Sequence, residues 1–307
     1  MTTGVLLMTY GSAKDQADVA AYMTRVRGGR TPSDELIAEF QRRYALIGGS
    51  PLIPITRRLA KQLEAVLGEG YVVEAGMRFS EPTIAEGVAA LSRRGAARVL
   101  GVILAPQYSP IIMGNYWDQL AAAGEAAGVP VRMVEDWHQT PAFLDLLAER
   151  VRTGLAAFPD EARDRVQVLM TAHSLPKRVV DRESEYVGKL KWTAQQVAER
   201  AGLPRERWHF CYQSAGHTPE EWLKPDMLDL LPELARQGVK HVMLAPVQFV
   251  ADHLETLYDI DVAGLAQARD AGVEDFRRVP APNDSLAFAE ALREVVRNNL
   301  AGWPRWT

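Results

Sequence analysis

Residues 166–176 read Val166-Gln167-Val168-Leu169-Met170-Thr171-Ala172-His173-Ser174-Leu175-Pro176. The first five residues form a valine-rich apolar run, which is typical of a buried strand. Pro176 disfavours a helical conformation at the residue before it, so the chain is expected to leave this strand as a loop. His173 therefore stands just past the carboxyl end of a strand, at the rim of an open α/β sheet where ligands bind. Taken alone, it is equally well explained as a loop histidine without a functional role.

The same arrangement occurs twice in the chain. Val5-Leu6-Leu7-Met8-Thr9-Tyr10-Gly11-Ser12 resembles residues 168–174, which places Tyr10 where the second copy has His173. Leu104-Ala105-Pro106-Gln107-Tyr108 likewise resembles Leu244-Ala245-Pro246-Val247-Gln248-Phe249, and both follow predicted strands. We therefore expect two similar lobes with a cleft lined by the strand ends of both, and Tyr10 facing His173 across it.

Apolar strand-like runs alternate with helical patterns along the whole chain. Such alternation is typical of βαβ units with parallel strands, so the predicted fold class is α/β with two doubly wound, Rossmann-like lobes. We expect an N-terminal lobe over 1–158, a C-terminal lobe over 159–284 that begins with a polar linker, and a C-terminal helix and tail over 285–307 that pack back on the N-terminal lobe. Strands are predicted at residues 5–9, 72–75, 98–104, 131–134, 166–171, 208–212, 239–244 and 275–279.

Composition restricts the class of protein. The chain has 307 residues, of which 47% are hydrophobic and 24% charged, as is ordinary for a globular protein of about two domains. Its net charge of −4 argues against a nucleic-acid binder. The single cysteine, Cys211, excludes an internal disulfide and an iron–sulfur cluster held by the cysteines of one chain. There is no signal-peptide pattern and no apolar run of about 18 residues, so we expect a cytoplasmic protein without an integral membrane segment.

A polar segment, residues 250–259, follows the second Leu-Ala-Pro strand end. If this segment is helical, Asp252, Glu255 and Asp259 share one face. That face is explained either as a solvated acidic surface that complements a helix dipole, or as a group that takes up protons or binds a divalent cation together with a histidine.

The remaining histidines carry weaker signals. His253 lies off the acidic face and is interpreted as a packed or capping residue, whereas His217 is a weak candidate for lining the cleft. None of the six histidines pairs with another at the spacing of a zinc finger, which argues against a structural zinc site.

Residues 21–62 form a basic segment close to Tyr10 in the sequence. They hold eight lysines and arginines against three acidic residues, a local charge of +5 on a chain of −4. Solvated helix faces explain this excess as well as an anionic substrate does. Arginine would suit such a substrate because its guanidinium matches the geometry of carboxylates.

Several motifs together resemble the ferrochelatase family, specifically its soluble bacterial members and their coproporphyrin III branch. The resemblance covers essentially the whole chain and is most specific in the histidine and Asp-His-Leu-Glu segments. It is carried by Leu7-Met8-Thr9-Tyr10-Gly11-Ser12, Arg43-Tyr44, Ile47-Gly48-Gly49-Ser50-Pro51-Leu52, Ala172-His173-Ser174-Leu175-Pro176, Gln213-Ser214, Trp222-Leu223, Pro225-Asp226 and Phe249-Val250-Ala251-Asp252-His253-Leu254-Glu255-Thr256-Leu257-Tyr258-Asp259.

The resemblance implies roles for individual residues. His173 and Glu255 correspond to the pair that handles iron and accepts protons on one face of the porphyrin. Tyr10 corresponds to a residue on the other face that can bind the iron of the product. The positions that contact the macrocycle or its propionates correspond to Arg27, Arg43, Tyr44, Ser50 and Tyr116, with Arg30 as a weaker addition.

Two departures from the family pattern bear on metal binding. Phe79 stands where some relatives have a histidine, and Ala263 stands where some have an acidic residue. A second, outer metal site is therefore not expected. No resident cofactor is expected either, since Fe²⁺ is a substrate of the reaction.

The resemblance implies an enzyme of the lyase class that inserts Fe²⁺ into coproporphyrin III in haem biosynthesis. We expect it to act as a monomer and to contact the next enzyme of the haem pathway transiently. The alternatives are a protoporphyrin IX ferrochelatase, a cobalt or nickel chelatase for a reduced tetrapyrrole, and a protein that binds haem or metal without turnover.

Overall fold

Two four-stranded parallel sheets organise the computed structural model, which describes residues 1–216, 220–301 and 303. By contact, the chain divides into two units. The first comprises residues 1–142, 251–254 and the segment from 283 onward, and the second comprises residues 143–250 and 255–282. Three crossovers connect the strands of each sheet, as the alternating sequence pattern predicted, and the expected α/β fold class is confirmed.

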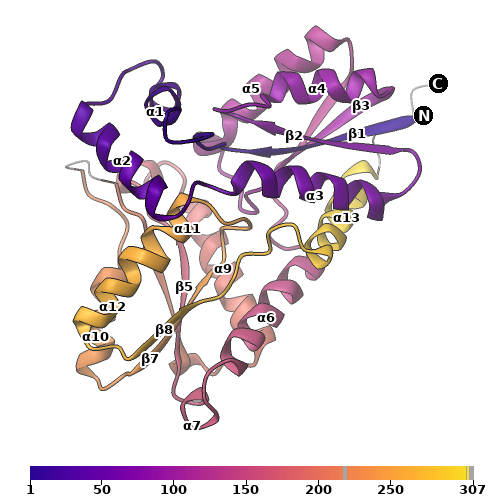
Figure 1. The fold of residues 1–307 in the computed structure, drawn as a ribbon. Helices are drawn as coiled ribbons and strands as arrows, with labels where there is room; N and C mark the ends of the chain where they lie inside the picture. Colours follow the sequence, from indigo (N-terminus) through magenta and orange to yellow (C-terminus); the bar gives the residue numbers. More distant parts are fainter. Residues whose placement is uncertain (217–219, 302, 304–307) are drawn as a thin grey trace. The chain divides into compact units, whose positions relative to one another are not determined.

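The first unit contains a sheet of order β2-β1-β3-β4 with helices on both faces (Figure 1). α4 and α5 pack against one face through a cluster that includes Leu6, Met8 and Leu120. α3 and α13 pack against each other and contact the strands as well. The elements are β1 Thr2–Thr9, α1 Val19–Val26, α2 Asp34–Leu46, α3 Leu52–Leu67, β2 Tyr71–Met77, α4 Ile84–Arg93, β3 Ala96–Ile103, α5 Pro110–Ala127, β4 Val131–Val134 and α13 Leu286–Leu300.

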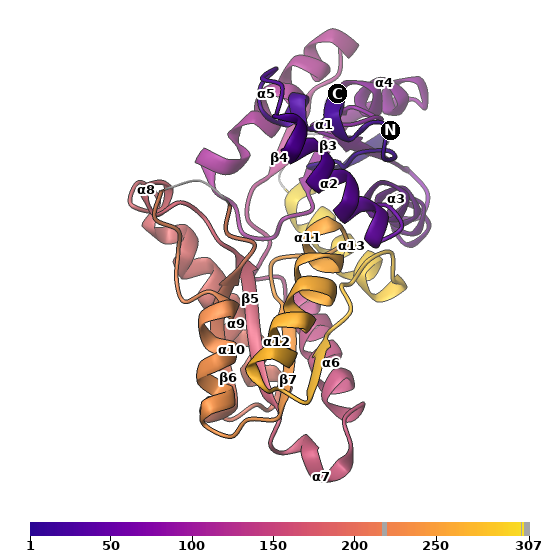
Figure 2. The ribbon, with the colours of Figure 1, turned by 60° about the vertical axis from the view of Figure 1, so that its left-hand side comes forward.

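The second unit repeats this order as β6-β5-β7-β8. α10 and α12 lie side by side on one face of its sheet, where Cys211, Leu231 and Ala268 belong to one buried cluster (Figure 2). α9 contacts β5 and β6. The elements are α6 Pro141–Ala156, α7 Asp160–Arg163, β5 Gln167–His173, α8 Lys177–Val180, α9 Ser184–Ala201, the 3₁₀-helix η1 Arg205–Arg207, β6 Trp208–Gln213, α10 Met227–Arg236, β7 His241–Pro246, α11 Leu254–Leu257, the π-helix η2 Asp259–Gly264, α12 Leu265–Ala271 and β8 Asp275–Arg278.

The internal repeat has a counterpart in the hydrogen bonds of the two sheets. Leu104 N donates to Met8 O at 2.9 Å in the first unit, and Val247 N donates to Thr171 O at 2.9 Å in the second. Met8 and Thr171 are the residues that the sequence comparison aligns, so Tyr10 and His173 follow equivalent strand positions in their own units. The Leu-Ala-Pro segments are not equivalent, because Pro246 pairs with Thr171 inside β7 whereas Pro106 lies beyond the end of β3.

The boundaries of the units differ from those expected at residues 158 and 284. α6 belongs mainly to the second unit, where Gly154 packs so closely that an added Cβ would lie 2.7 Å from Met243 Sδ and 3.3 Å from Val279 Cγ2. The predicted linker at 159–164 contains the short helix α7. α13 belongs to the first unit, in which it packs against α3.

The predicted helix from Asp15 begins only at Val19. Asp18 N donates to Asp15 Oδ1 at 2.9 Å, and Lys14 N donates to Asp18 Oδ2 at 2.9 Å. Aspartate side chains that bind nearby backbone in this way compete with the first turn of a helix.

Within the described residues, no helix combines the length and the apolar character that a membrane crossing requires.

Candidate active site

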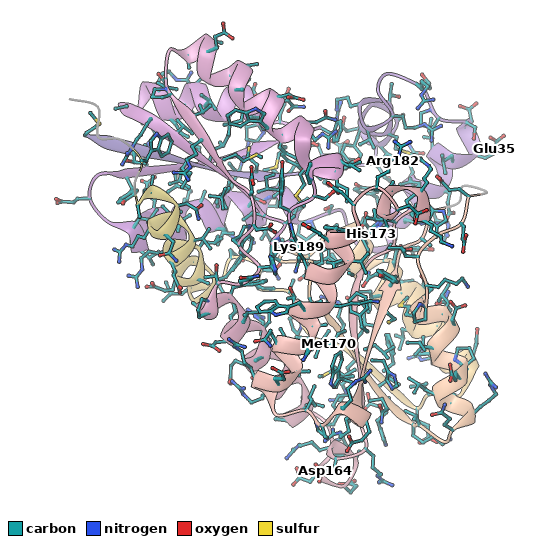
Figure 3. The ribbon with its side chains drawn as sticks, turned by 180° about the vertical axis from the view of Figure 1, so that it is seen from behind. Glu35, Asp164, Met170, His173, Arg182 and Lys189 are labelled. Carbon is teal, nitrogen blue, oxygen red and sulfur yellow. The ribbon has the colours of Figure 1, made fainter. Side chains whose placement is uncertain are left out.

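His173 is the last residue of β5, at the carboxyl edge of the second sheet (Figure 3). Its backbone N–H donates to Gln248 Oε1 at 2.8 Å, which fixes the main chain at that point. Its ring nitrogen Nδ1 contacts the carbonyl oxygen of Ser174. Since a carbonyl oxygen only accepts, Nδ1 carries the proton of the neutral ring and Nε2 keeps its lone pair.

Glu255 lies opposite that lone pair. Its Oε2 atom is 3.6 Å from His173 Nε2, and the two side chains are 36% and 27% exposed. Nitrogen and oxygen ligands of one divalent cation each lie about 2 Å from the metal, so a separation of this size suits a shared cation. It also suits a proton passed between the two groups through a water molecule. The structure thus brings these two predicted residues together.

The prediction of one acidic helix face is wrong. α11 spans only Leu254–Leu257 and is followed by a π-helix, so the assumed regular α-helical spacing does not hold from 252 to 259. Asp252 binds Asn283, whose Nδ2 donates to Asp252 Oδ2 at 2.7 Å. Asp259 Oδ2 accepts from Ser214 Oγ at 2.5 Å. Across residues 1–216, 220–301 and 303, no group of three or more histidine, cysteine and acidic side chains is placed to hold a metal ion.

Buried polar groups support the His173 strand end. Gln248 Nε2 donates to Tyr186 Oη at 2.5 Å, and burial raises the pKa of Tyr186, which keeps this phenol neutral. Burial also raises the pKa of Asp226, against the opposing effect of the Leu228 N–H that this carboxyl caps. His217, a weak candidate from the sequence, lies outside the described residues.

Tyr10 directly follows β1 in the first unit, and its loop is joined to the loop after β2. Arg78 N donates to Thr9 O at 2.9 Å and Phe79 N to Tyr10 O at 3.1 Å, which continues the sheet pairing past both strands. The Tyr10 and Phe79 rings make an edge-to-face contact with centroids 4.7 Å apart. Tyr10 nevertheless remains 44% exposed.

The turn after Tyr10 is held by three further elements. Ser80 Oγ donates to Ser12 O at 2.6 Å. Tyr22 Oη in α1 donates to Gly11 O at 3.0 Å, and Ala13 N donates to Tyr44 Oη in α2 at 3.2 Å. The predicted Tyr44 therefore acts within this unit as a buried support of the Tyr10 loop.

Arg78 is the residue at this site that the sequence reasoning missed. Its guanidinium carbon lies 5.9 Å from the ring centroid of Tyr10 and 5.4 Å from that of Tyr116, and 4.7 Å from that of Phe79. Arg78 Nη1 donates to Ile112 O at 3.3 Å, and its buried Nε has no hydrogen-bond partner among the residues that the structure describes. Burial raises the pKa of Tyr116, and Arg78 opposes that shift. One signal in the sequence could have pointed to Arg78: it stands just before Phe79, directly after the end of a strand.

The other predicted substrate residues lie on separate elements of the first unit. Arg43 Nε is 2.8 Å from Glu39 Oε1, and with Arg42 it lowers the pKa of Glu39 to about 2. Arg27 follows the end of α1, and Arg30 Nε donates to its carbonyl oxygen at 3.3 Å. Ser50 Oγ accepts from Leu52 N at 3.5 Å at the start of α3.

Comparison with known proteins decides the family. The Ferrochelatase family model matches residues 2–300. The chain belongs to the ferrochelatase family. It is 40% identical over 301 residues to a ferrochelatase of Herpetosiphon aurantiacus, covering 96% of this chain and 98% of that protein. It is 37% identical over 310 residues to a coproporphyrin III ferrochelatase of Geobacillus kaustophilus, covering 98% and 96% of the two chains.

A solved structure supports the fold independently. SirB from Bacillus subtilis, determined with Fe³⁺, superposes with a TM-score of 0.59 at 13% identity over 98% of each chain. At that identity the likeness concerns the fold alone.

The family model and the curated relatives confirm the family and the enzyme class that the sequence motifs implied, since those relatives are ferrochelatases, which are porphyrin metal chelatases.

Proposed function

We propose that this member of the ferrochelatase family inserts Fe²⁺ into coproporphyrin III in haem biosynthesis. The observation that carries the proposal is the pairing of His173 and Glu255 at the carboxyl edge of the second sheet, 3.6 Å apart and both partly exposed. An imidazole lone pair beside a carboxylate suits the two tasks of the reaction, which are binding ferrous iron and removing the pyrrole protons.

The choice of coproporphyrin III has two supports. Six of the curated relatives, at 33–37% identity, are named coproporphyrin III ferrochelatases, although two others, at 40% and 36% identity, are named simply ferrochelatases. Coproporphyrin III also carries more propionate groups than protoporphyrin IX, which suits the local charge of +5 over residues 21–62. Protoporphyrin IX is the alternative substrate.

Metal insertion requires distortion of a flat ring, loss of two pyrrole protons and removal of water from Fe²⁺. We assign the binding of the macrocycle and its propionates to Arg27, Arg43, Tyr44, Ser50 and Tyr116, whose remote binding energy can hold the ring about 1–5 kcal/mol above its relaxed geometry. We assign iron binding and proton removal jointly to His173 and Glu255, a contribution of about 10²–10⁴-fold. Tyr10 is assigned to the iron of the product.

The test is anaerobic Fe²⁺ insertion with coproporphyrin III and protoporphyrin IX side by side, followed by the Soret absorbance of each product. We expect a higher kcat/KM with coproporphyrin III. A preference for protoporphyrin IX would change the proposed substrate but leave the proposed reaction, iron insertion, in place. Insertion of cobalt or nickel into sirohydrochlorin in place of either reaction would favour a chelatase for reduced tetrapyrroles, and binding without any product would favour a binding protein.

A further inference from the structure

We propose that Gln213 is a positioning residue, which fixes Glu255 at its working distance from His173 through a buried side-chain amide. The proposal rests on the proposed function, since it concerns the same pair. Gln213 touches neither the iron nor the porphyrin in this proposal and acts only through Glu255.

Gln213 ends β6 and is fully buried. Its Oε1 accepts from Thr171 Oγ1 at 2.6 Å, and Thr171 is itself fully buried inside β5. Its Nε2 donates to the carbonyl oxygen of Glu255 at 3.2 Å and lies 3.4 Å from Ser214 Oγ. One amide therefore joins the interior of the sheet to the backbone of Glu255, in buried surroundings where an unmade hydrogen bond is destabilising.

The backbone of Gln213 is tied to the other member of the pair. His173 and Gln213 are register partners in the β5–β6 ladder, and Ser174 N donates to Gln213 O at 2.8 Å. Movement of Gln213 would thus change the position of Glu255 relative to a strand end that His173 occupies.

Glu255 needs such an external support because its own helix is short. α11 has only four residues and gives way to a π-helix. A helix of one turn has little stability of its own, since nucleation fixes several residues for a single hydrogen bond. The hydrogen bond from Gln213 therefore helps to hold the Glu255 backbone in place, which a helix of one turn does only weakly by itself.

Only an amide of this length meets both demands. A glutamate would place a carboxylate against the carbonyl oxygen of Glu255, and an asparagine would be one methylene too short. A methionine would fill the space but would leave Thr171 Oγ1 and the Glu255 carbonyl without this partner.

The decisive variants are Gln213→Met and the double variant Thr171→Val/Gln213→Met. Removing both partners of a buried hydrogen bond disturbs stability less than removing one, so the double variant should lose less Tm than Gln213→Met, while the Glu255 carbonyl loses the Gln213 donor in both variants. The single variant Thr171→Ser keeps the hydroxyl that Gln213 accepts from, so it should retain the activity of the wild type. Thr193→Val is the matched control, since it makes the same change at a fully buried threonine of α9 whose hydroxyl bonds Lys189 O at 2.9 Å.

Three quantities are measured: kcat and KM for coproporphyrin III with Fe²⁺, and Zn²⁺ affinity by calorimetry without porphyrin. Partners that orient a metal-binding group are typically worth about 10–100-fold in activity or metal affinity. We therefore expect both glutamine variants to lower kcat and Zn²⁺ affinity by about 10–100-fold, with KM changed less than about twofold. Thr193→Val should change none of these quantities by more than about twofold.

The outcomes separate this proposal from the proposed function. Wild-type kcat and Zn²⁺ affinity in the double variant would overturn the role of Gln213 and leave the chelatase assignment intact, as would a loss confined to KM. If the wild type does not insert iron into any porphyrin, the proposed function fails, and Zn²⁺ affinity alone then decides the role of Gln213.

Discussion

His173 Nε2 and Glu255 Oε2 lie 3.6 Å apart, with the imidazole proton directed away from the carboxylate toward Ser174 O. This separation exceeds that of a direct hydrogen bond between the two groups. The pair comes from a strand end and from a four-residue helix more than 80 residues later, and each member is held through its backbone by a glutamine side chain.

Replacing either member should stop iron insertion. We expect His173→Ala and Glu255→Gln each to lower kcat by about 10²–10⁴-fold, with porphyrin affinity by fluorescence quenching unchanged within about threefold. His209→Ala is the control, because His209 pairs with Leu169 near the start of β5, toward the other end from His173. Normal turnover by His173→Ala would remove that residue from its assigned role.

The turn after Tyr10 should not tolerate a side chain. Gly11 has φ +93°, and a Cβ there would lie 2.7 Å from Ser80 Oγ. We expect Gly11→Ala to destabilise the protein by about 1–3 kcal/mol in chemical denaturation. Gly188→Ala, at an open helical position of α9, should instead stabilise it by about 0.5–1 kcal/mol. Equal effects of the two substitutions would contradict this account.

The basic segment should affect binding more than chemistry. We expect Arg27→Ala to raise KM for coproporphyrin III about fivefold while kcat stays constant, since an exposed charge contact is worth at most about 1 kcal/mol. The effect should shrink as salt is added. Arg93→Ala, at the end of α4, is the control. A fall in kcat without a rise in KM would place Arg27 elsewhere in the reaction.

Glu64 should give the first unit a pH-dependent stability. Glu64 Oε1 is 2.7 Å from Arg94 Nη2, and Val73 N donates to Glu64 Oε2 at 2.7 Å. Burial acts to raise the pKa of Glu64, but these two hydrogen bonds outweigh it and the pKa is lowered. The stabilisation is therefore present above the ordinary glutamate pKa of 4.5 and is lost as the pH falls through the lowered value.

Thermal unfolding of Glu64→Gln tests this linkage. At pH 7 we expect a loss of about 1 kcal/mol, because both partners are about one-third exposed. The difference from the wild type should vanish below the folded pKa. Glu149→Gln, in a well-exposed pair with Arg152, should change the stability by less than about 0.5 kcal/mol. A difference that persists in acid would contradict the assignment.

The strands and the main site residues were accessible from sequence because both depend on local patterns. All eight predicted strands form, and Tyr10 and His173 stand at the ends where the apolar runs placed them. The acidic face from Asp252 to Asp259 failed for a physical reason, since regular periodicity does not reveal a π-helix or an aspartate bound to Asn283.

Arg78 could not be found in the same way. Its aromatic neighbours Tyr10, Phe79 and Tyr116 come from the loop after β1, the loop after β2 and α5, so only the folded chain brings them together. The two Leu-Ala-Pro segments match in sequence, but their positions in the two sheets differ by three residues. The sequence did not reveal this difference for a related reason. Sequence similarity shows which residues repeat, but the register of the ladder decides which of them are structurally equivalent.

α13 follows every other described helix and strand in the sequence, yet it packs against α3 in the unit that contains β1. A ribosome that has made residues 1–158 has therefore made an unfinished first unit, which still lacks 251–254 and the segment from 283 onward. The second unit needs nothing beyond residue 282 and is complete earlier. The first unit, which starts before the second in the sequence, thus waits longer for the segments that complete its native packing, with apolar helix surface uncovered in the meantime.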